Sequence, residues 1–213
     1  MKLYIARATC SLAAQLTANE LDLSPELVHF DVINRTTSNG QSFSDVNPLA
    51  YVPVLELGNE SDDRLTETIV VTSYMADQHP DAGLIPAPGT LERAKFDQLL
   101  VFVATEIAQK HIPLMRKLLT DEGALWTRNK LVKAYSDLDR RLADGRTYIT
   151  GDTFTVADAY IWATMWHERS GAKIDHLENL MAYVARVEAR PSAQKALRDE
   201  AELVAQHQAR AAA

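Results

Sequence analysis

Cys10 is the residue of this sequence with the most distinctive chemistry. It follows a short β-prone segment at residues 3–6 and precedes a helical pattern that starts at Ser11. The free N–H groups and the dipole of a helix N-terminus favour an anion, and a thiol placed there can have its pKa lowered from about 8.5 into the ~3.5–7.5 range. Arg7 adds positive charge just upstream. The position therefore predicts a reactive thiol, whereas a cysteine kept only for packing would be buried and inert.

The redox chemistry open to Cys10 is limited because this is the only cysteine of the chain. A single thiol excludes an intrachain disulfide framework and a Cys-rich metal site, and it suits a reducing compartment. The run Cys10-Ser11-Leu12-Ala13 has no second cysteine at the position where dithiol proteins carry C-x-x-C. Thiol–disulfide exchange at Cys10 would therefore need an external thiol.

Composition and motif content exclude several classes of protein. The 213 residues include 22 Lys plus Arg and 29 Asp plus Glu, and the net charge of −7 argues against nucleic-acid binding. The six histidines show no metal-ligand spacing, and no glycine-rich nucleotide motif is present, so we expect no metal. No apolar run approaches the ~18 residues of a membrane helix, and Met1 leads into no signal-peptide pattern. We therefore expect a cytoplasmic protein without membrane contact.

The expected elements divide the chain into a mixed α/β front and a helical back. Residues 1–80 show the order β-α-β, a polar irregular segment, then β-β-α, with strands near 3–6, 27–32, 52–57 and 64–66 and helices from 11 and over 67–78. Residues 81–90 have the proline and glycine content of a linker. Residues 91–213 predict helices only, over 91–116, 125–142, 157–168, 177–187 and 193–204. We expect an α/β domain followed by an all-α domain.

A capping box is expected in the helical part. Thr155 is followed three residues later by Asp158, just before an apolar run. The Thr155 hydroxyl can accept from the Asp158 backbone N–H while the Asp158 carboxylate accepts from the Thr155 N–H. Phe154 stands where a hydrophobic staple would be. This pattern marks the start of a helix that we expect to be central and buried.

Several segments, taken in order, resemble the cytosolic glutathione S-transferases, and in particular the cysteine-bearing beta class of bacteria. They are Met1-Lys-Leu-Tyr, Cys10-Ser-Leu-Ala, Asn47-Pro-Leu-Ala-Tyr-Val-Pro-Val-Leu and Thr66-Glu-Thr, and the capping box also matches the family. The resemblance implies a thioredoxin-like first domain with a glutathione site and an all-helical second domain that lines the electrophile site. It also implies a homodimer that uses glutathione as co-substrate against a small hydrophobic electrophile.

The resemblance assigns roles to residues of the first domain. Cys10 matches the cysteine that lies beside the glutathione sulfur and can form a mixed disulfide with it. Val52 matches the residue before a cis-proline, here Pro53, and its backbone would pair with the cysteinyl part of glutathione. Glu67 and Thr68 match a Glu-Ser pair that takes the γ-glutamyl end. A carboxylate of glutathione suits the helix N-terminus at Thr68, and the Glu67 carboxylate suits the α-ammonium group.

A further match, Arg35, replaces a lysine near the glycyl carboxylate and keeps its charge, although the two cations differ in geometry. Simpler explanations stay open for two of the assigned sites. A proline such as Pro53 is also typical of a strand entrance. Glu67 and Thr68 could serve only to cap their helix.

Departures from the family lie in the first long helix of the second domain. Val101 stands where the family usually has Asn, and Ala108 stands where it usually has His. The segment around Thr105 and Glu106 otherwise follows the family pattern, and His111 lies nearly one helical turn further on. We expect Thr105, Glu106 and His111 as possible residues of the second-substrate site, with a structural role as the alternative for His111.

Two hypotheses about function follow. The first is an enzyme that binds glutathione and promotes attack of its thiol on an electrophile, or that exchanges disulfides through Cys10. The second is a binding or regulatory protein that keeps the fold without conjugation. Retention of Cys10, Arg35, Glu67 and Thr68 favours the enzyme, whereas the changes at residues 101 and 108 favour the second hypothesis.

Overall fold

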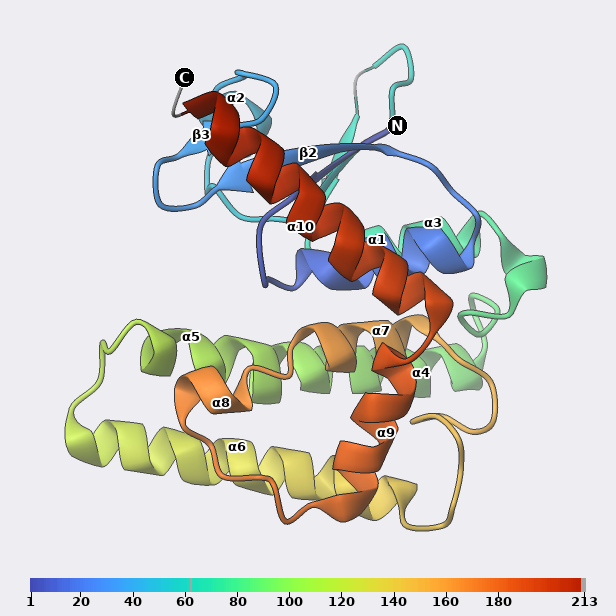
Figure 1. Ribbon diagram of the computed structural model, residues 1–213. Helices are drawn as coiled ribbons and strands as arrows, with labels where there is room; N and C mark the ends of the chain where they lie inside the picture. Colours follow the sequence, from blue (N-terminus) through green and yellow to red (C-terminus); the bar gives the residue numbers. More distant parts are fainter. Residues whose placement is uncertain (62, 212–213) are drawn as a thin grey trace. The chain divides into compact units, whose positions relative to one another are not determined.

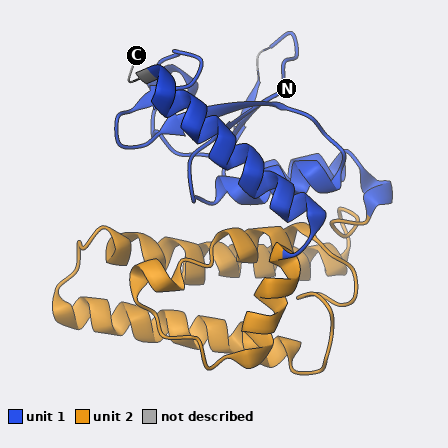
Figure 2. Cartoon of the chain, viewed as in Figure 1, with its two compact units in different colours: residues 1–82, 189–213 blue, residues 83–188 orange. Residues whose placement is uncertain are grey.

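A computed structural model describes residues 1–61 and 63–211. Its contacts group the chain into two compact units, which are coloured separately in Figure 2. Unit 1 comprises Met1–Ala82 together with Ala189–Ala213, and unit 2 comprises Gly83–Glu188. Within the described residues, no helix is both long and apolar enough to cross a membrane.

Unit 1 is built on a five-stranded mixed sheet in the order β3-β2-β1-β4-β5. β1 and β2 are parallel, and every other neighbouring pair is antiparallel. The strands are β1 (Lys2–Ile5), β2 (Glu26–Asp31), β3 (Thr36–Thr37), β4 (Val54–Glu56) and β5 (Arg64–Thr66). This is a thioredoxin-like arrangement, as expected, but the segment expected to be irregular contains the additional short strand β3, which pairs with β2.

The two faces of this sheet carry different helices because side chains alternate along a strand. Leu3 and Ile5 point to one face, where they pack with Leu55 and with residues of α1 (Ser11–Glu20) and α3 (Thr68–Asp77). Tyr4 points to the other face and packs there with Phe43 of the short α2 (Phe43–Val46). A 3₁₀ turn at Pro80–Ala82 ends this part of the chain. The sheet is therefore covered on both sides.

The last helix, α10 (Pro191–Ala211), belongs to unit 1. It lies against α1 and β2, as Figure 1 shows, and Leu203 packs on the Leu3 and Ile5 cluster. This grouping differs from the expected boundaries of 1–80, 81–90 and 91–213, which placed the whole helical back in one domain. A helical pattern indicates which face is apolar but does not indicate which core that face covers.

Unit 2 is helical, as expected. Its helices are α4 (Leu91–Phe102), α5 (Gln109–Met115), α6 (Asp121–Leu142), α7 (Val156–Ala163), α8 (His167–Ser170) and α9 (Glu178–Glu188). A π-helical segment at Val103–Ala108 interrupts the single helix that the sequence predicted over 91–116. The predicted helix over 157–168 also ends early, at Ala163. Hydrophobic spacing over 25 residues does not resolve a local change from i−4 to i−5 hydrogen bonding.

The predicted capping box at the start of α7 is present. The fully buried Asp158 carboxylate accepts from the Thr155 backbone N–H at 2.8 Å and also from the Thr155 hydroxyl at 2.8 Å. It further accepts from the Ile149 N–H at 2.9 Å and from the Tyr183 hydroxyl at 2.7 Å. One carboxylate therefore joins α7 to α9 and to the loop before α7, beyond what the sequence motif predicted.

Candidate functional site

The topology of unit 1 brings the predicted glutathione residues to one edge of the sheet. Tyr4 of β1 pairs with Val54 of β4, and Val54 pairs with Thr66 of β5. Because β4 runs antiparallel to its neighbours, the C-terminal ends of β1 and β5 meet the N-terminal end of β4. The C-terminal end of β2 lies at the same edge, because β2 is parallel to β1. The segments that leave this edge carry the predicted residues Cys10, Arg35, Val52, Pro53, Glu67 and Thr68.

The Cys10 thiol lies directly beside the segment that enters β4. Its Sγ donates to the backbone carbonyl oxygen of Val52, with a donor–acceptor distance of 3.4 Å. The Val52–Pro53 peptide bond is cis, as the resemblance implied. Cys10 occupies the N-cap position of α1 with helical backbone angles, and its side chain does not cap the helix. Cys10 as a residue is half-buried, and its sulfur is directed toward the neighbouring loop.

The surroundings of Cys10 keep the thiol protonated. Burial raises the pKa of the Cys10 thiol and is the largest effect, and the negative charge of Glu67 raises it further. The Thr68 hydroxyl and the backbone N–H of Cys10 hydrogen-bond to the sulfur and oppose this rise. The pKa of the Cys10 thiol is therefore raised overall, which corrects our expectation that the helix N-terminus would lower it. Desolvation disfavours the thiolate, and the bond to the Val52 carbonyl favours the S–H form.

Glu67 has a backbone conformation that its sequence did not reveal. Its φ is +65°, in the left-handed region that residues with a Cβ rarely adopt. Its side chain is exposed and makes no capping hydrogen bond to α3. The Glu67 side chain therefore does not cap this helix. Thr68, the first residue of α3, is buried. Such strain, at a residue that precedes a helix N-terminus, is typical of functional sites.

Arg35 lies on the exposed turn between β2 and β3. Its backbone N–H donates to the Asp31 carbonyl at 2.8 Å, and its φ of +56° closes the turn. The Asp31 carboxylate also accepts from the backbone N–H groups of Ile33 and Asn34. The turn is therefore held by its own backbone, and the cation of Arg35 is presented to solvent at the same edge of the sheet as Cys10.

Glu200 is a residue of this region that sequence reasoning missed. It lies in α10, and its Oε1 accepts from the backbone N–H of Ala8 at 3.1 Å. Ala8 has a left-handed φ of +53° and lies on the loop between β1 and Cys10. Glu200 is only 6% exposed, and burial raises the pKa of its carboxyl group. Nothing in the sequence near residue 200 connects it with residue 8, so only the fold identifies this contact.

The residues predicted for the second-substrate site lie in unit 2. Thr105 and Glu106 belong to the π-helical segment Val103–Ala108. Thr105 is exposed and donates its hydroxyl to the Val101 carbonyl at 3.0 Å. Glu106 forms an ion pair with Lys110 at 2.9 Å. Both side chains therefore reach solvent from this segment.

His111 differs from these two residues because it is fully buried in unit 2. Its Nε2 lies 2.8 Å from the Tyr135 hydroxyl, which donates to the Thr164 carbonyl at 3.3 Å. Burial lowers the pKa of His111 to about 4, with the positive charges of His167 and Arg169 adding to the effect. The geometry favours the structural alternative for His111, a neutral core histidine that joins α5 to α6 through Tyr135.

Over the described part of the chain, residues 1–61 and 63–211, no group of three or more His, Cys, Asp or Glu side chains could hold a metal ion.

Comparison with known proteins identifies the family. A family model for the glutathione S-transferase C-terminal domain matches residues 105–200. Glutathione S-transferase GstA of Escherichia coli O157:H7 is 32% identical over 201 residues, covering 94% of this chain and 98% of the relative. The solved structure of BphK, a bacterial glutathione S-transferase in a ternary complex, has a TM-score of 0.88 and 34% identity over 94% of this chain and all of its own.

Two further solved structures are similar. A sphingomonad glutathione S-transferase complexed with glutathione has a TM-score of 0.87 and 34% identity, over 94% of this chain and 99% of its own. A beta-class glutathione S-transferase of Sphingomonas chungbukensis has a TM-score of 0.86 and 35% identity, over 94% of this chain and 98% of its own. The fold and these similarities define a glutathione transferase, and the chain belongs to the glutathione S-transferase family. Its activity is the conjugation of glutathione to electrophiles, and the predicted likeness to the bacterial beta class is confirmed.

Proposed function

We propose that glutathione binds at the sheet edge of unit 1, with its sulfur beside Cys10. The observation that carries this proposal is the contact between the Cys10 sulfur and the Val52 carbonyl, next to the Thr68 hydroxyl. The Val52 backbone would pair with the cysteinyl part of glutathione, beside the cis bond to Pro53. The N-terminus of α3 at Thr68 would receive the γ-glutamyl carboxylate, and Glu67 would receive the ammonium group. Arg35 would meet the glycyl carboxylate.

In conjugation, Cys10 acts as a hydrogen-bond donor to the glutathione sulfur. Its pKa is raised, so the thiol holds its proton at neutral pH and can donate it in a hydrogen bond to a glutathione thiolate. A donor aimed at a developing or existing negative charge stabilises it without forming a covalent bond. Conjugation therefore needs the proton on Cys10, not its nucleophilicity.

Thiol–disulfide exchange is a second candidate activity, favoured by the free thiol of Cys10, a residue that is only half-buried. The Cys10 thiolate would attack the glutathione sulfur of a mixed disulfide, forming a Cys10–glutathione disulfide, and the other thiol would leave as a thiolate as the original S–S bond breaks. A glutathione thiolate would then release Cys10 and leave as oxidised glutathione. The raised pKa makes this reaction faster at alkaline pH than at neutral pH.

The second substrate is proposed to be a small hydrophobic electrophile, and Thr105 and Glu106 are proposed to contact it. Support comes from their position on a π-helical segment, a feature frequent at functional sites. The burial of His111 removes it from this proposal. We further propose a cytoplasmic homodimer that uses glutathione as co-substrate and no metal. Light scattering on the purified protein tests the dimer.

Retention of the protein on immobilised glutathione tests the proposed site. We expect retention, elution by free glutathione, and turnover with a model aryl halide. A matched variant, Thr68→Val, keeps the size of the side chain and removes the hydroxyl, and we expect weaker retention. Retention that is unchanged in Thr68→Val and in Glu67→Gln would contradict the proposed placement of the γ-glutamyl end.

A further inference from the structure

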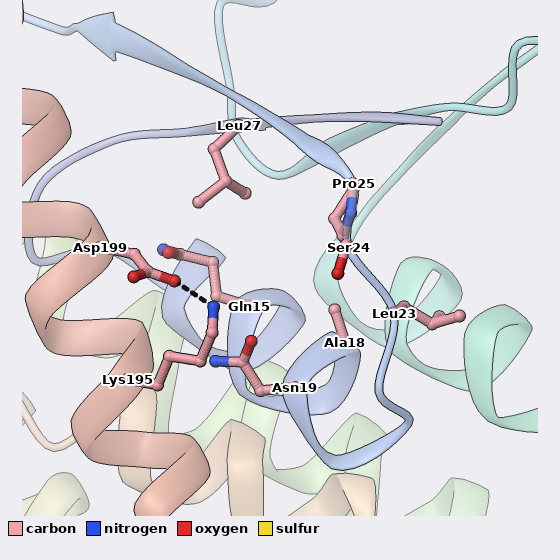
Figure 3. A pocket seen from close by; sticks show the side chains of 9 residues that line it. All are labelled: Gln15, Ala18, Asn19, Leu23, Ser24, Pro25, Leu27, Lys195 and Asp199. Atoms are coloured by element: carbon pink, nitrogen blue, oxygen red, sulfur yellow. Dashed lines mark hydrogen bonds and ion pairs between the residues drawn. The ribbon is translucent and has the colours of Figure 1, made fainter.

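A pocket lies in unit 1, on residues that the glutathione proposal does not use. It is a cavity of about 150 Å³ between α1, α10 and the segment that leads into β2 (Figure 3). Gln15, Ala18 and Asn19 line it from one face of α1, at the i, i+3 and i+4 spacing of neighbours on a helix. Lys195 and Asp199 line it from α10.

The unusual group in this pocket is the side-chain amide of Gln15. Gln15 is 3% exposed, and over residues 1–61 and 63–211 neither its Nε2 nor its Oε1 has a hydrogen-bond partner. The neighbouring polar groups are engaged, since Asn19 donates to the Ser192 carbonyl at 3.0 Å and Lys195 forms an ion pair with Asp199. Buried polar groups without partners are rare in native proteins because desolvation is not compensated. Among the described residues, a donor and an acceptor are thus left side by side without partners at the wall of this pocket.

The remaining walls are mostly apolar, with the Ser24 hydroxyl as a further polar group. Leu23, Pro25 and Leu27 line the pocket from the segment before and within β2, and Ala18 adds a small side chain from α1. A cavity of this volume accommodates a molecule of about the size of benzene. The only charged side chains of the lining, Lys195 and Asp199, neutralise each other. The lining therefore suits a small, flat and uncharged molecule.

We propose that this pocket binds a small planar molecule with an amide edge, in which an N–H donor stands next to a C=O acceptor. The amide of Gln15 offers the complementary pair, because its NH₂ group donates and its oxygen accepts. The apolar side chains would cover the faces of the ring. Lactams and pyrimidine-type heterocycles belong to this class.

The test uses 2-pyridone, which has the size of benzene and one amide edge, and N-methyl-2-pyridone, which cannot donate. Both are titrated into the full chain with glutathione at saturating concentration, and binding is followed by ¹H–¹⁵N NMR. We expect 2-pyridone to shift the amide signals of residues 15–27 and 195–199 and to bind at least tenfold more tightly than its N-methyl analogue. Gln15→Met keeps the length of the side chain and removes its polar atoms, so we expect the two ligands to bind this variant equally.

Three outcomes would overturn the proposal. One is equal affinity of the unaltered protein for the two ligands, a comparison that does not depend on the folding of any variant. Another is competition with glutathione, which would place the ligand at the Cys10 edge. The third is the absence of saturable shifts up to about 10 mM ligand, the range of weak fragment binding, which would leave water as the partner of Gln15. None of these readouts requires turnover.

Discussion

The Nδ1 atom of His29 in β2 lies 2.8 Å from the Nδ1 atom of His207 in α10, and the two rings meet edge to face. Both side chains are buried. The Nε2 of His207 also lies 3.3 Å from the Thr36 hydroxyl oxygen of β3. One of the two Nδ1 atoms must donate and the other accept, so the bond requires at least one neutral ring. This pair fastens the end of the last helix to the sheet.

Acidification is expected to weaken this attachment. Burial lowers the pKa of His29, and the positive charge of His207 lowers it further, against the opposing carboxylate of Asp31. A histidine whose pKa is depressed by folding contributes stability that is present above its unfolded pKa of about 6.5 and lost as the pH falls through the folded value. Urea unfolding at pH 7.5 and pH 5.5 measures the loss. His207→Phe, which keeps an aromatic ring, should lose less stability on acidification. Parallel losses in both proteins would contradict the prediction.

Removal of the Cys10 thiol should separate the two candidate reactions. In Cys10→Ala we expect disulfide exchange to be abolished, because no sulfur is left to form the mixed disulfide. Conjugation should continue at a rate reduced about tenfold, the equivalent of one charge-assisted hydrogen bond. Cys10→Ser keeps a donor and should conjugate faster than Cys10→Ala. Assays with an aryl halide and with a glutathione mixed disulfide measure both rates, and equal loss of both in Cys10→Ala would rule out this division.

Two adjacent residues should shift the pKa of the Cys10 thiol in opposite directions. The charge of Glu67 raises this pKa, so Glu67→Gln should lower it. The Thr68 hydroxyl lowers it, so Thr68→Val should raise it. The rate of alkylation by iodoacetamide as a function of pH reports the thiolate directly. Because the pKa of the unaltered protein is raised, its alkylation midpoint should lie above the ordinary cysteine value of about 8.5. Shifts of the same sign in the two variants would show that the assigned causes are wrong.

Glu200 should matter through the loop that precedes Cys10. Glu200→Ala removes the acceptor for the Ala8 N–H and should lower the free energy of unfolding by about 1 kcal/mol, the net value of one hydrogen bond. Glu200→Gln keeps an oxygen acceptor without a buried charge and should match the unaltered protein in stability. Chemical denaturation measures both variants. If Glu200→Gln were as destabilised as Glu200→Ala, the bond to Ala8 would not be the reason.

Asp158 should be the most sensitive position of unit 2. Asp158→Asn replaces one of the two acceptor oxygens by an NH₂ group that faces N–H and O–H donors, and we expect a loss of roughly 2–4 kcal/mol. Tyr183→Phe removes a single donor and should cost about 1 kcal/mol. Thermal unfolding, monitored by circular dichroism, compares the stabilities of the two variants. A smaller loss in Asp158→Asn than in Tyr183→Phe would contradict the central role of the carboxylate.

The sequence was sufficient for the elements whose signals are local. The strand before Cys10 and the capping box from Thr155 to Asp158 each depend on a few adjacent residues, and both are present as expected. The cis bond before Pro53 was expected from the family resemblance and not from a local signal. The left-handed φ of Glu67 was not predictable, because such a conformation in a residue with a Cβ is imposed by the surrounding fold. The contacts of Glu200 and His207 were not predictable either. The periodicity of a helix shows which of its faces is apolar, but it does not show which other element that face packs against.

The discontinuity of unit 1 has a consequence for synthesis of the protein. Its sheet and first helices are made early, but α10, which covers α1 and β2, is made only after the whole of unit 2. A nascent chain on the ribosome therefore carries the sheet with part of its apolar surface uncovered until α10 has been made. Unit 2, continuous over Gly83–Glu188, has all of its residues before that moment. The order of translation lets the second unit complete its core before the first.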